Sequence, residues 1–261
     1  MISSKIKSRI GKIDGKIGIF YMDILSEESC TVGNCDVFIS AGIAKLPIIV
    51  EAFRQIDLGI IKKEDVYCLK ESDKVPSLGA LNNLHESIQL TIEDLYKLMI
   101  IVSDNTATNI LIEILGIENI NSTMTAMGFD KTRIERKFFD KQKADLGYEN
   151  RFSLVEMGEL LKRLYNLQII SSKFSQEIIN ILKEQQRNNI IPYYFEEEMP
   201  IAHLQGADFK ILHNIGIVFS ERPFIICMGS NDADTRKVEG IMRDIALMCY
   251  NHSNKEQPRS K

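Results

Sequence analysis

Isoleucine recurs at intervals of three and four residues at the start of the chain, at Ile2, Ile6, Ile10 and Ile13. Basic residues occupy several of the positions between them, so the pattern predicts an amphipathic helix with its apolar face packed on the protein. Two short apolar segments follow, residues 18–24 and 30–32, and a polar turn separates them. We expect these two segments to form a β-hairpin.

The middle of the chain has the periodicity of helices. Apolar residues recur with a period near 3.6 in six segments, at residues 48–58, 91–102, 106–115, 117–127, 153–167 and 172–183. Thr91 precedes Asp94, and Ser153 precedes Glu156, by the three residues of a capping box. Gly116 and Gly128 stand where helices often end in a left-handed residue. The pattern therefore predicts a helical region.

Strand patterns return after Pro200, at residues 213–219 and 223–228, and a closing helix is predicted at 238–250. Strands near both ends of the chain, with helices between them, predict an α+β protein with one sheet built from both chain ends. We expect a single domain over residues 1–261. Its sheet lobe takes in approximately residues 1–45 and 200–250, and an all-helical lobe, approximately 46–199, is inserted between them.

The composition is that of an ordinary globular protein, with 261 residues, of which 44% are hydrophobic and 26% charged. A net charge of −4 gives no field that attracts nucleic acid or an anionic membrane, so we expect neither as a partner. No apolar run reaches the roughly 18 residues that span a bilayer. The first twenty residues lack a secretory signal, which predicts a cytoplasmic protein, or an exported one if a leader has been removed.

Metal and cofactor chemistry have little support in the sequence. The four histidines, His85, His203, His213 and His252, do not have the spacing of a helical zinc pair. No glycine-rich loop follows a predicted strand and opens a helix, as a phosphate-binding loop does. The five cysteines are odd in number and mostly lie among apolar residues, which suits reduced thiols. We therefore expect neither a metal nor a cofactor.

Two motifs suggest a chemistry. Lys45 follows Gly42 by three residues at the start of a helical segment, and Ser103-Asp104-Asn105 lies within a later one. They resemble the SxxK and SDN blocks of class A β-lactamases and penicillin-binding proteins. Further segments resemble that family in the same order, at residues 90–100, 115–116, 127–129, 132–134, 147–150 and 213–218. The resemblance implies an antiparallel sheet flanked by the terminal helices, a helical lobe beside it, and an active site between the lobes.

The first block lacks its serine. In a working relative the serine lies three residues before the lysine on one helical face, the lysine removes its proton, and an acyl-enzyme forms. The resemblance places Gly42 at this nucleophile position, where glycine has no side chain to acylate. Ser40 lies two residues earlier on a different side of the segment, so we do not expect it to act as the nucleophile. A cap or strand-end hydroxyl is its expected role.

The resemblance assigns roles to the second block. Ser103 corresponds to a residue that relays protons to the leaving group, and Asn105 to one that donates a hydrogen bond to the substrate's amide side chain. Asp104 is expected to stabilise its loop through local hydrogen bonds.

The third block, Lys-Thr-Gly, is expected on an inner strand, and Leu204, Gln205 and Gly206 occupy it here. Leu204 replaces the lysine that holds a substrate carboxylate, and an apolar side chain cannot form that charge-assisted bond. Phe138 falls near the family's water-activating glutamate. Asp140 is expected to be an exposed aspartate paired with Lys141 or Lys143.

Two functions remain open. The first is a catalytically impaired protein that binds a small amide or peptide ligand in the inter-lobe cleft. Its site residues are Lys45, Ser103 and Asn105 from the family's catalytic set, with Gly42, Leu204, Gln205 and Gly206 as further ligand contacts. The alternative is an amide hydrolase of β-lactamase type with residual or altered activity, in which Lys45 or Ser103 activates a water molecule near Gly42. Family residues are replaced at several positions, which favours natural divergence over one engineered substitution. The sequence does not determine the oligomeric state.

Overall fold

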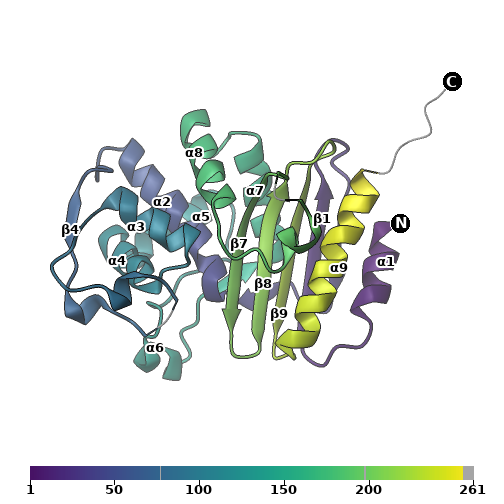
Figure 1. Ribbon diagram of the computed structural model, residues 1–261, viewed down its shortest axis with the longest axis horizontal. Helices are drawn as coiled ribbons and strands as arrows, with labels where there is room; N and C mark the ends of the chain where they lie inside the picture. Colours follow the sequence, from purple (N-terminus) through teal and green to yellow (C-terminus); the bar gives the residue numbers. More distant parts are fainter. Residues whose placement is uncertain (77, 197, 255–261) are drawn as a thin grey trace.

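A five-stranded antiparallel sheet forms one side of the molecule, and most of the helices gather on the other side (Figure 1). The computed structural model describes residues 1–76, 78–196 and 198–254. The strand order across the sheet is β2 (Ser29–Gly33), β1 (Lys16–Asp23), β9 (Phe224–Asn231), β8 (Ile211–Val218) and β7 (Ile201–Asp208). The predicted hairpin is confirmed as β1 and β2. The α+β class is confirmed as well, with one sheet that both ends of the chain build.

Pairing between β1 and β9 joins the two ends of the chain. The two strands pair over their full length, with Ile19 opposite Met228 and Tyr21 opposite Ile226. Every residue of β9 is buried because helices cover both faces of the sheet. Such a fully buried strand has no polar positions in alternation, which explains its nearly continuous apolar sequence.

One face of the sheet packs on the terminal helices, α1 (Ile2–Ile10) and α9 (Thr235–Ser253), which lie side by side in Figure 1. The predicted isoleucine stripe is confirmed there for Ile2, Ile6 and Ile10, which are buried, whereas Ile13 lies beyond the end of α1 and is half-buried. Arg9 on α1 donates from Nε to Asp244 Oδ2 on α9 at 2.7 Å. The terminal helices therefore form one layer over the sheet.

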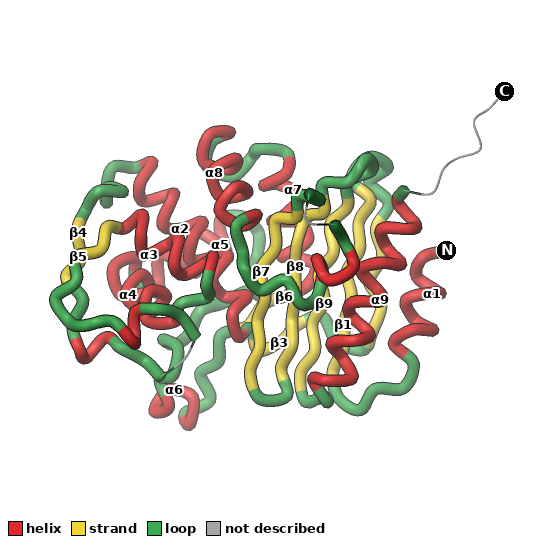
Figure 2. The backbone as a smooth tube through the Cα atoms, viewed as in Figure 1, coloured by secondary structure: helices red, strands yellow, loops and turns green. Residues whose placement is uncertain are grey.

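The other face packs on α7 (Leu154–Tyr165) and, near β7, on α8 (Ser172–Lys183). The remaining helices are α2 (Lys45–Asp57), α3 (Ile92–Ile101), α4 (Asn105–Leu115), α5 (Ile117–Ala126) and the short α6 (Lys141–Asp145). Helix α2 is buried at almost every position and runs through the middle of this group (Figure 2). All six helices predicted in this region are present, with ends within three residues of those expected.

Short elements connect the long ones and were not predicted. Strands β3 (Val37–Ile39) and β6 (Arg151–Ser153) pair with each other, as do β4 (Val66–Cys68) and β5 (Gln89–Thr91). Single 3-10 turns occur at η1 (Ala41–Ala44), η2 (Glu71–Asp73), η3 (Leu81–Asn83) and η4 (Ile191–Tyr194). Segments of three or four residues are too short to show a period, so a hydrophobic pattern cannot reveal them.

Several local predictions can be compared with the structure. The capping box from Thr91 to Asp94 is confirmed, as are the positive φ angles of Gly116 and Gly128, 82° and 83°. The second box is only half formed. Ser153 Oγ accepts from Glu156 N, but the Glu156 carboxylate binds Lys131 N and Thr132 Oγ1 instead of returning to Ser153.

The strand of the third motif is placed differently from expectation. Strand β7 pairs only with β8 in the described part of the sheet, so the prediction of an inner strand is wrong. It forms the sheet edge that lies nearest the helical group, and η1 at the start of α2 packs against it. None of the helices in the described ranges combines the length and apolar character needed to cross a bilayer.

Candidate functional site

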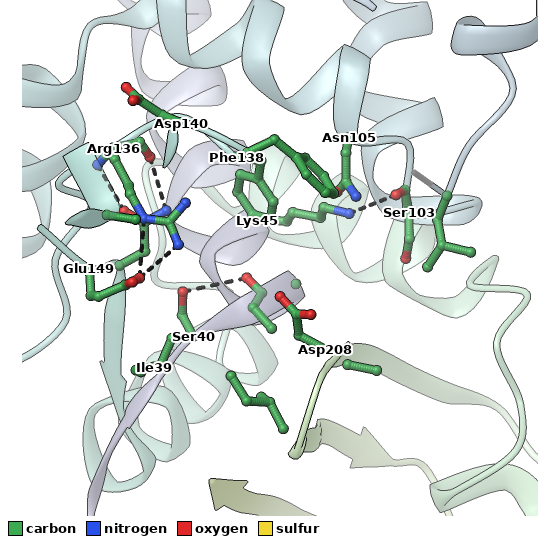
Figure 3. Close-up of a pocket in the computed structure, with 18 of the residues that line it drawn as sticks. Ile39, Ser40, Lys45, Ser103, Asn105, Arg136, Phe138, Asp140, Glu149 and Asp208 are labelled. Atoms are coloured by element: carbon green, nitrogen blue, oxygen red, sulfur yellow. Dashed lines mark hydrogen bonds and ion pairs between the residues drawn. The ribbon is translucent and has the colours of Figure 1, made fainter. Parts of the chain in front are cut away.

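A cavity of about 280 Å³ lies where the β7 edge of the sheet meets the start of α2 (Figure 3). It brings together five residues predicted for the site: Gly42, Lys45, Ser103, Asn105 and Gln205. Leu204 and Gly206 are not among its lining residues. Side chains alternate across a strand, and Leu204 faces the other way, fully buried in the hydrophobic core. The expected contact of Leu204 with a ligand therefore has no support in its placement.

Lys45 is the first residue of α2 and is only 1% exposed. Its Nζ donates to the backbone oxygen of Ser103 at 2.8 Å, and the centroid of the Phe138 ring lies 5.7 Å away (Figure 3). Among the described residues no carboxylate forms an ion pair with it. Burial lowers the pKa of Lys45 to about 7, against the attraction of Asp104 and with the help of repulsion from Arg187. Near neutral pH much of this amine is therefore uncharged.

The turn between α3 and α4 holds Ser103 against Lys45. Ser103 has a φ of 58°, in the left-handed region. Asp104 caps α4 by accepting from Ala107 N at 2.8 Å, and it also accepts from Ala80 N and Leu81 N at 2.7 and 2.8 Å. The predicted local role of Asp104 is confirmed. Buried Ser103 Oγ has no hydrogen-bond partner in the described part of the chain.

Gly42 lies in η1, where the backbone of β7 approaches closely. A Cβ atom added to Gly42 would lie 2.5 Å from the backbone oxygen of Gln205 and 3.2 Å from Gly206 Cα. A Cβ added to Gly206 would lie 2.9 Å from Gly42 N, so both glycines serve one close contact. Any side chain at position 42 requires the strand or the turn to move.

The hydroxyl of Ser40 bonds within its own turn. The residue is completely buried, and its Oγ donates to the oxygen of Ala41 at 3.4 Å, a long bond. It precedes η1 as the cap residue, but its side chain makes no capping bond. Within the described ranges, no hydrogen bond joins Ser40 to Lys45, and its predicted inactivity as a nucleophile stays a prediction.

A loop from residue 135 to 150 forms the wall opposite β7. Asn109 on α4 fixes Phe138 in this loop, accepting from Phe138 N at 2.7 Å and donating to Phe138 O at 2.9 Å. Asn150 Oδ1 accepts from the backbone nitrogens of Glu135 and Arg136. These bonds hold the Phe138 ring beside the amine of Lys45.

Asp140 has a different role from the one expected. Its Oδ1 accepts from Lys143 N at 3.0 Å and caps α6. Its carboxylate forms no ion pair with the Lys141 or Lys143 side chain among the described contacts, so the prediction of that pairing is wrong. A backbone cap satisfies the carboxylate at the helix start without ordering a long lysine side chain.

Arg187 is a site residue that the sequence analysis missed. It lies in the loop between α8 and η4, is partly buried, and lines the cavity. Its guanidinium has no ion pair or hydrogen bond among the described residues, although Glu239 attracts it, and burial lowers its pKa. A single arginine in a polar loop has no pattern that marks it as a site residue. Only the folded chain brings it to the cavity.

Comparisons with known proteins agree with this architecture. The profile of the β-lactamase enzyme family matches residues 1–253. β-Lactamase VEB-1 from Pseudomonas aeruginosa is 21% identical over 268 residues, covering 96% of this chain and 90% of that protein. The crystal structure of a β-lactamase from Sphaerobacter thermophilus has a TM-score of 0.89 at 22% identity, covering 98% of each chain. PBP-A has a TM-score of 0.88 at 23% identity, covering 98% of this chain and 96% of its own.

Proposed function

Because this chain belongs to the β-lactamase enzyme family, we propose that it is a member without acylation chemistry that binds a small amide or peptide ligand. The observation that carries the proposal is the contact at Gly42. In the alignment with the SxxK block this residue takes the place of the nucleophile, and the β7 backbone leaves no room there for a side chain. A covalent ester needs a hydroxyl that this position does not have.

The surroundings of Lys45 support the proposal. In the acylation mechanism the lysine takes a proton from a neighbouring hydroxyl. Here its amine donates to the carbonyl oxygen of Ser103. Phe138 packs beside it, and in the resemblance to the family this residue falls near the carboxylate that activates water. The groups that would prepare a nucleophile and a hydrolytic water are replaced by a carbonyl and an aromatic ring.

The cavity retains groups that suit a ligand. Buried Gln205 Oε1 and Ser103 Oγ have no hydrogen-bond partners among the described residues. A ligand amide that bonded to them would relieve the penalty of unsatisfied buried polar atoms. Arg187 and Lys141 also line the cavity and supply positive charge that Leu204 does not. These features favour a small amide that also carries a carboxylate.

A slow hydrolase is the second candidate. The lowered pKa of Lys45 favours it, because a neutral amine in the cavity is able to take a proton from water. A free water molecule lacks the fixed position of an attached nucleophile, so this route is expected to be far slower than an acyl-enzyme route.

A chromogenic cephalosporin tests both candidates because it contains an amide and a carboxylate. We expect saturable binding by calorimetry and no change in absorbance above the buffer control. The Gln205→Ala variant, which removes one unsatisfied acceptor, is expected to bind more weakly. Turnover that the Lys45→Met variant abolishes would favour the hydrolase, and absence of both binding and turnover would contradict both candidates.

A further inference from the structure

We propose that Lys45 is a covalent capture site for small oxo acids: its amine forms a reversible imine with the carbonyl carbon, and Arg187 holds the carboxylate. The proposal uses the cavity of the proposed function but adds a chemistry that needs no serine and cleaves no amide. It rests on the setting of one buried amine, a nearby unpaired guanidinium, and the space beside them.

The hydrogen bonding of Lys45 favours a nucleophilic amine. A lysine ammonium has three donors and no lone pair. The described residues offer this nitrogen one acceptor, the oxygen of Ser103 at 2.8 Å, and Phe138 closes another side. A neutral amine uses that acceptor with one N–H and keeps a lone pair. The site therefore suits the uncharged form, which is the form that attacks carbonyl carbon.

The two charges nearest in effect to Lys45 act in opposite directions, and the attraction of Asp104 outweighs the repulsion of Arg187, so desolvation is what favours the neutral amine. Arg187 repels the ammonium form, while Asp104 attracts it. The Asp104 carboxylate is already occupied by three backbone N–H groups, of Ala80, Leu81 and Ala107. A neighbouring cation and desolvation are the two conditions that activate lysine nucleophiles.

The other charged groups of the cavity lie in its walls. Arg136 and Glu149 neutralise each other in an ion pair of 2.8 Å. Asp140 caps α6, Lys141 follows it, and Asp208 binds Phe209 N at the end of β7. All of them line the cavity.

The same cavity suits an anion with a carbonyl group. Arg187 is a guanidinium without an ion pair in the described ranges, and it lines the cavity together with Lys45. A guanidinium binds carboxylate through two parallel hydrogen bonds. A molecule with a ketone or aldehyde next to its carboxylate satisfies both residues at once. The volume of about 280 Å³ limits the ligand to a small one.

The reaction balances without an oxidant or reductant. The nitrogen of Lys45 attacks the carbonyl carbon, the C–N bond forms, and one proton moves from nitrogen to the former carbonyl oxygen. The C–O bond then breaks, and the second nitrogen proton leaves with the hydroxyl as water, giving the imine. The hydroxyl of Ser103 belongs to the residue that binds the amine, and it has no hydrogen-bond partner among the described residues, so it is available to carry these protons.

Reductive trapping with glyoxylate tests the capture site. The full chain is incubated with a limiting amount of glyoxylate and sodium cyanoborohydride at neutral pH, and the carboxymethylated lysine is located by peptide mapping. We expect a single modification at Lys45. The Lys45→Met variant should lose it, whereas Lys12→Met, which removes an exposed lysine that does not line the cavity, should retain it. Modification spread over exposed lysines, with Lys45 unmodified in the wild-type chain, would overturn the proposal.

A neutral aldehyde isolates the role of Arg187. In the Arg187→Met variant, labelling of Lys45 by glyoxylate should slow by about tenfold or more, the effect of losing one charge-assisted contact. Labelling by propanal, which has no carboxylate, should slow much less, because it loses only the repulsion of the ammonium form by Arg187. An equal effect on both aldehydes would refute the carboxylate assignment. Cephalosporin binding without Lys45 labelling would overturn this proposal alone, and labelling without cephalosporin binding would overturn the binding function alone.

Discussion

At the scale of single residues, the burial of Lys45 has a consequence for stability. Its amine is 1% exposed and has one hydrogen bond, so the charged form is disfavoured in the folded chain. Its pKa is about 7 in the folded state and near 10.4 in the unfolded state. Below pH 7 both states hold the proton, and the folded state carries the full penalty. Between these two values the unfolded state binds more protons, so stability rises with pH.

We therefore expect the Lys45→Met variant to be more stable than wild type at pH 6. The difference in unfolding free energy between the variant and wild type should shrink as the pH approaches 10. The change should be on the order of 4 to 5 kcal/mol, which corresponds to the difference between the folded-state and unfolded-state pKa of Lys45. Urea unfolding of both proteins at pH 6, 8 and 10 measures the change. A difference in the free energy of unfolding that stays constant across this range would show that Lys45 does not titrate as described.

Gly42 gives a second prediction at this scale. The Gly42→Ser variant places Cβ about 2.5 Å from the backbone oxygen of Gln205, so it should lose roughly 1 to 3 kcal/mol of stability. The Gly42→Ala variant makes the same clash without a hydroxyl and serves as the matched control. Thermal unfolding should show similar losses for both variants, and neither should hydrolyse a cephalosporin. Efficient turnover by Gly42→Ser at wild-type stability would contradict the steric account.

At the scale of elements, asparagine side chains fix the loop from 135 to 150 and the residue that precedes it. Asn109 binds both backbone groups of Phe138, and Asn121 binds both backbone groups of Ile134 in the same way. Of these two residues, Phe138 lines the cavity and Ile134 does not. The two asparagines thus form a matched pair, one at the site and one away from it.

Asn109→Ala and Asn121→Ala should each destabilise the chain by about 1 to 3 kcal/mol, because each leaves two partly buried backbone groups unpaired. Only Asn109→Ala should free the Phe138 ring, admit water to Lys45 and raise its pKa towards the ordinary value. The pH dependence of Lys45 labelling by propanal measures that pKa. Equal shifts in both variants would mean that Phe138 does not shield the amine.

The elements also show what the sequence can and cannot predict. Helices such as α3 and α7 have a long apolar period and strong caps, so pattern and capping residues locate them well. The sequence analysis predicts an inner strand for the third motif, but β7 pairs with β8 alone and lies at the edge, and no local pattern reports which strands pair. Gly42, Lys45, Ser103 and Asn105 were found because they lie in ordered motifs. Arg187 lies in no motif and reaches the cavity only through the packing of α8.

At the scale of the whole molecule, a buried histidine connects the sheet to the site. His213 on β8 donates from Nε2 to the oxygen of Ile39 at 2.8 Å and accepts at Nδ1 from Ser230 N at 3.2 Å. Ile39 ends β3, just before η1 and Gly42. Burial lowers the pKa of His213 to about 4. The neutral ring therefore ties the centre of the sheet to the segment that carries the cavity.

Acid should weaken this connection. Because the folded-state pKa of His213 lies below the unfolded value near 6.5, its contribution is fully present above pH 6.5 and is lost as the pH falls towards 4. Between pH 6.5 and 4 the free energy of unfolding of the wild-type chain should fall by about 3 kcal/mol more than that of the His213→Gln variant. Urea unfolding at pH 7, 5.5 and 4.5 compares the two slopes. Parallel curves would exclude His213 as a source of the acid sensitivity.

The central claim is that this chain keeps the fold of its family without a hydroxyl that can be acylated. Intact-protein mass spectrometry after prolonged incubation with penicillin G tests it most directly. The account predicts no serine-linked adduct, and therefore no mass increase that hydroxylamine removes. A stoichiometric, hydroxylamine-labile adduct mapped to Ser40 or Ser103 would contradict it.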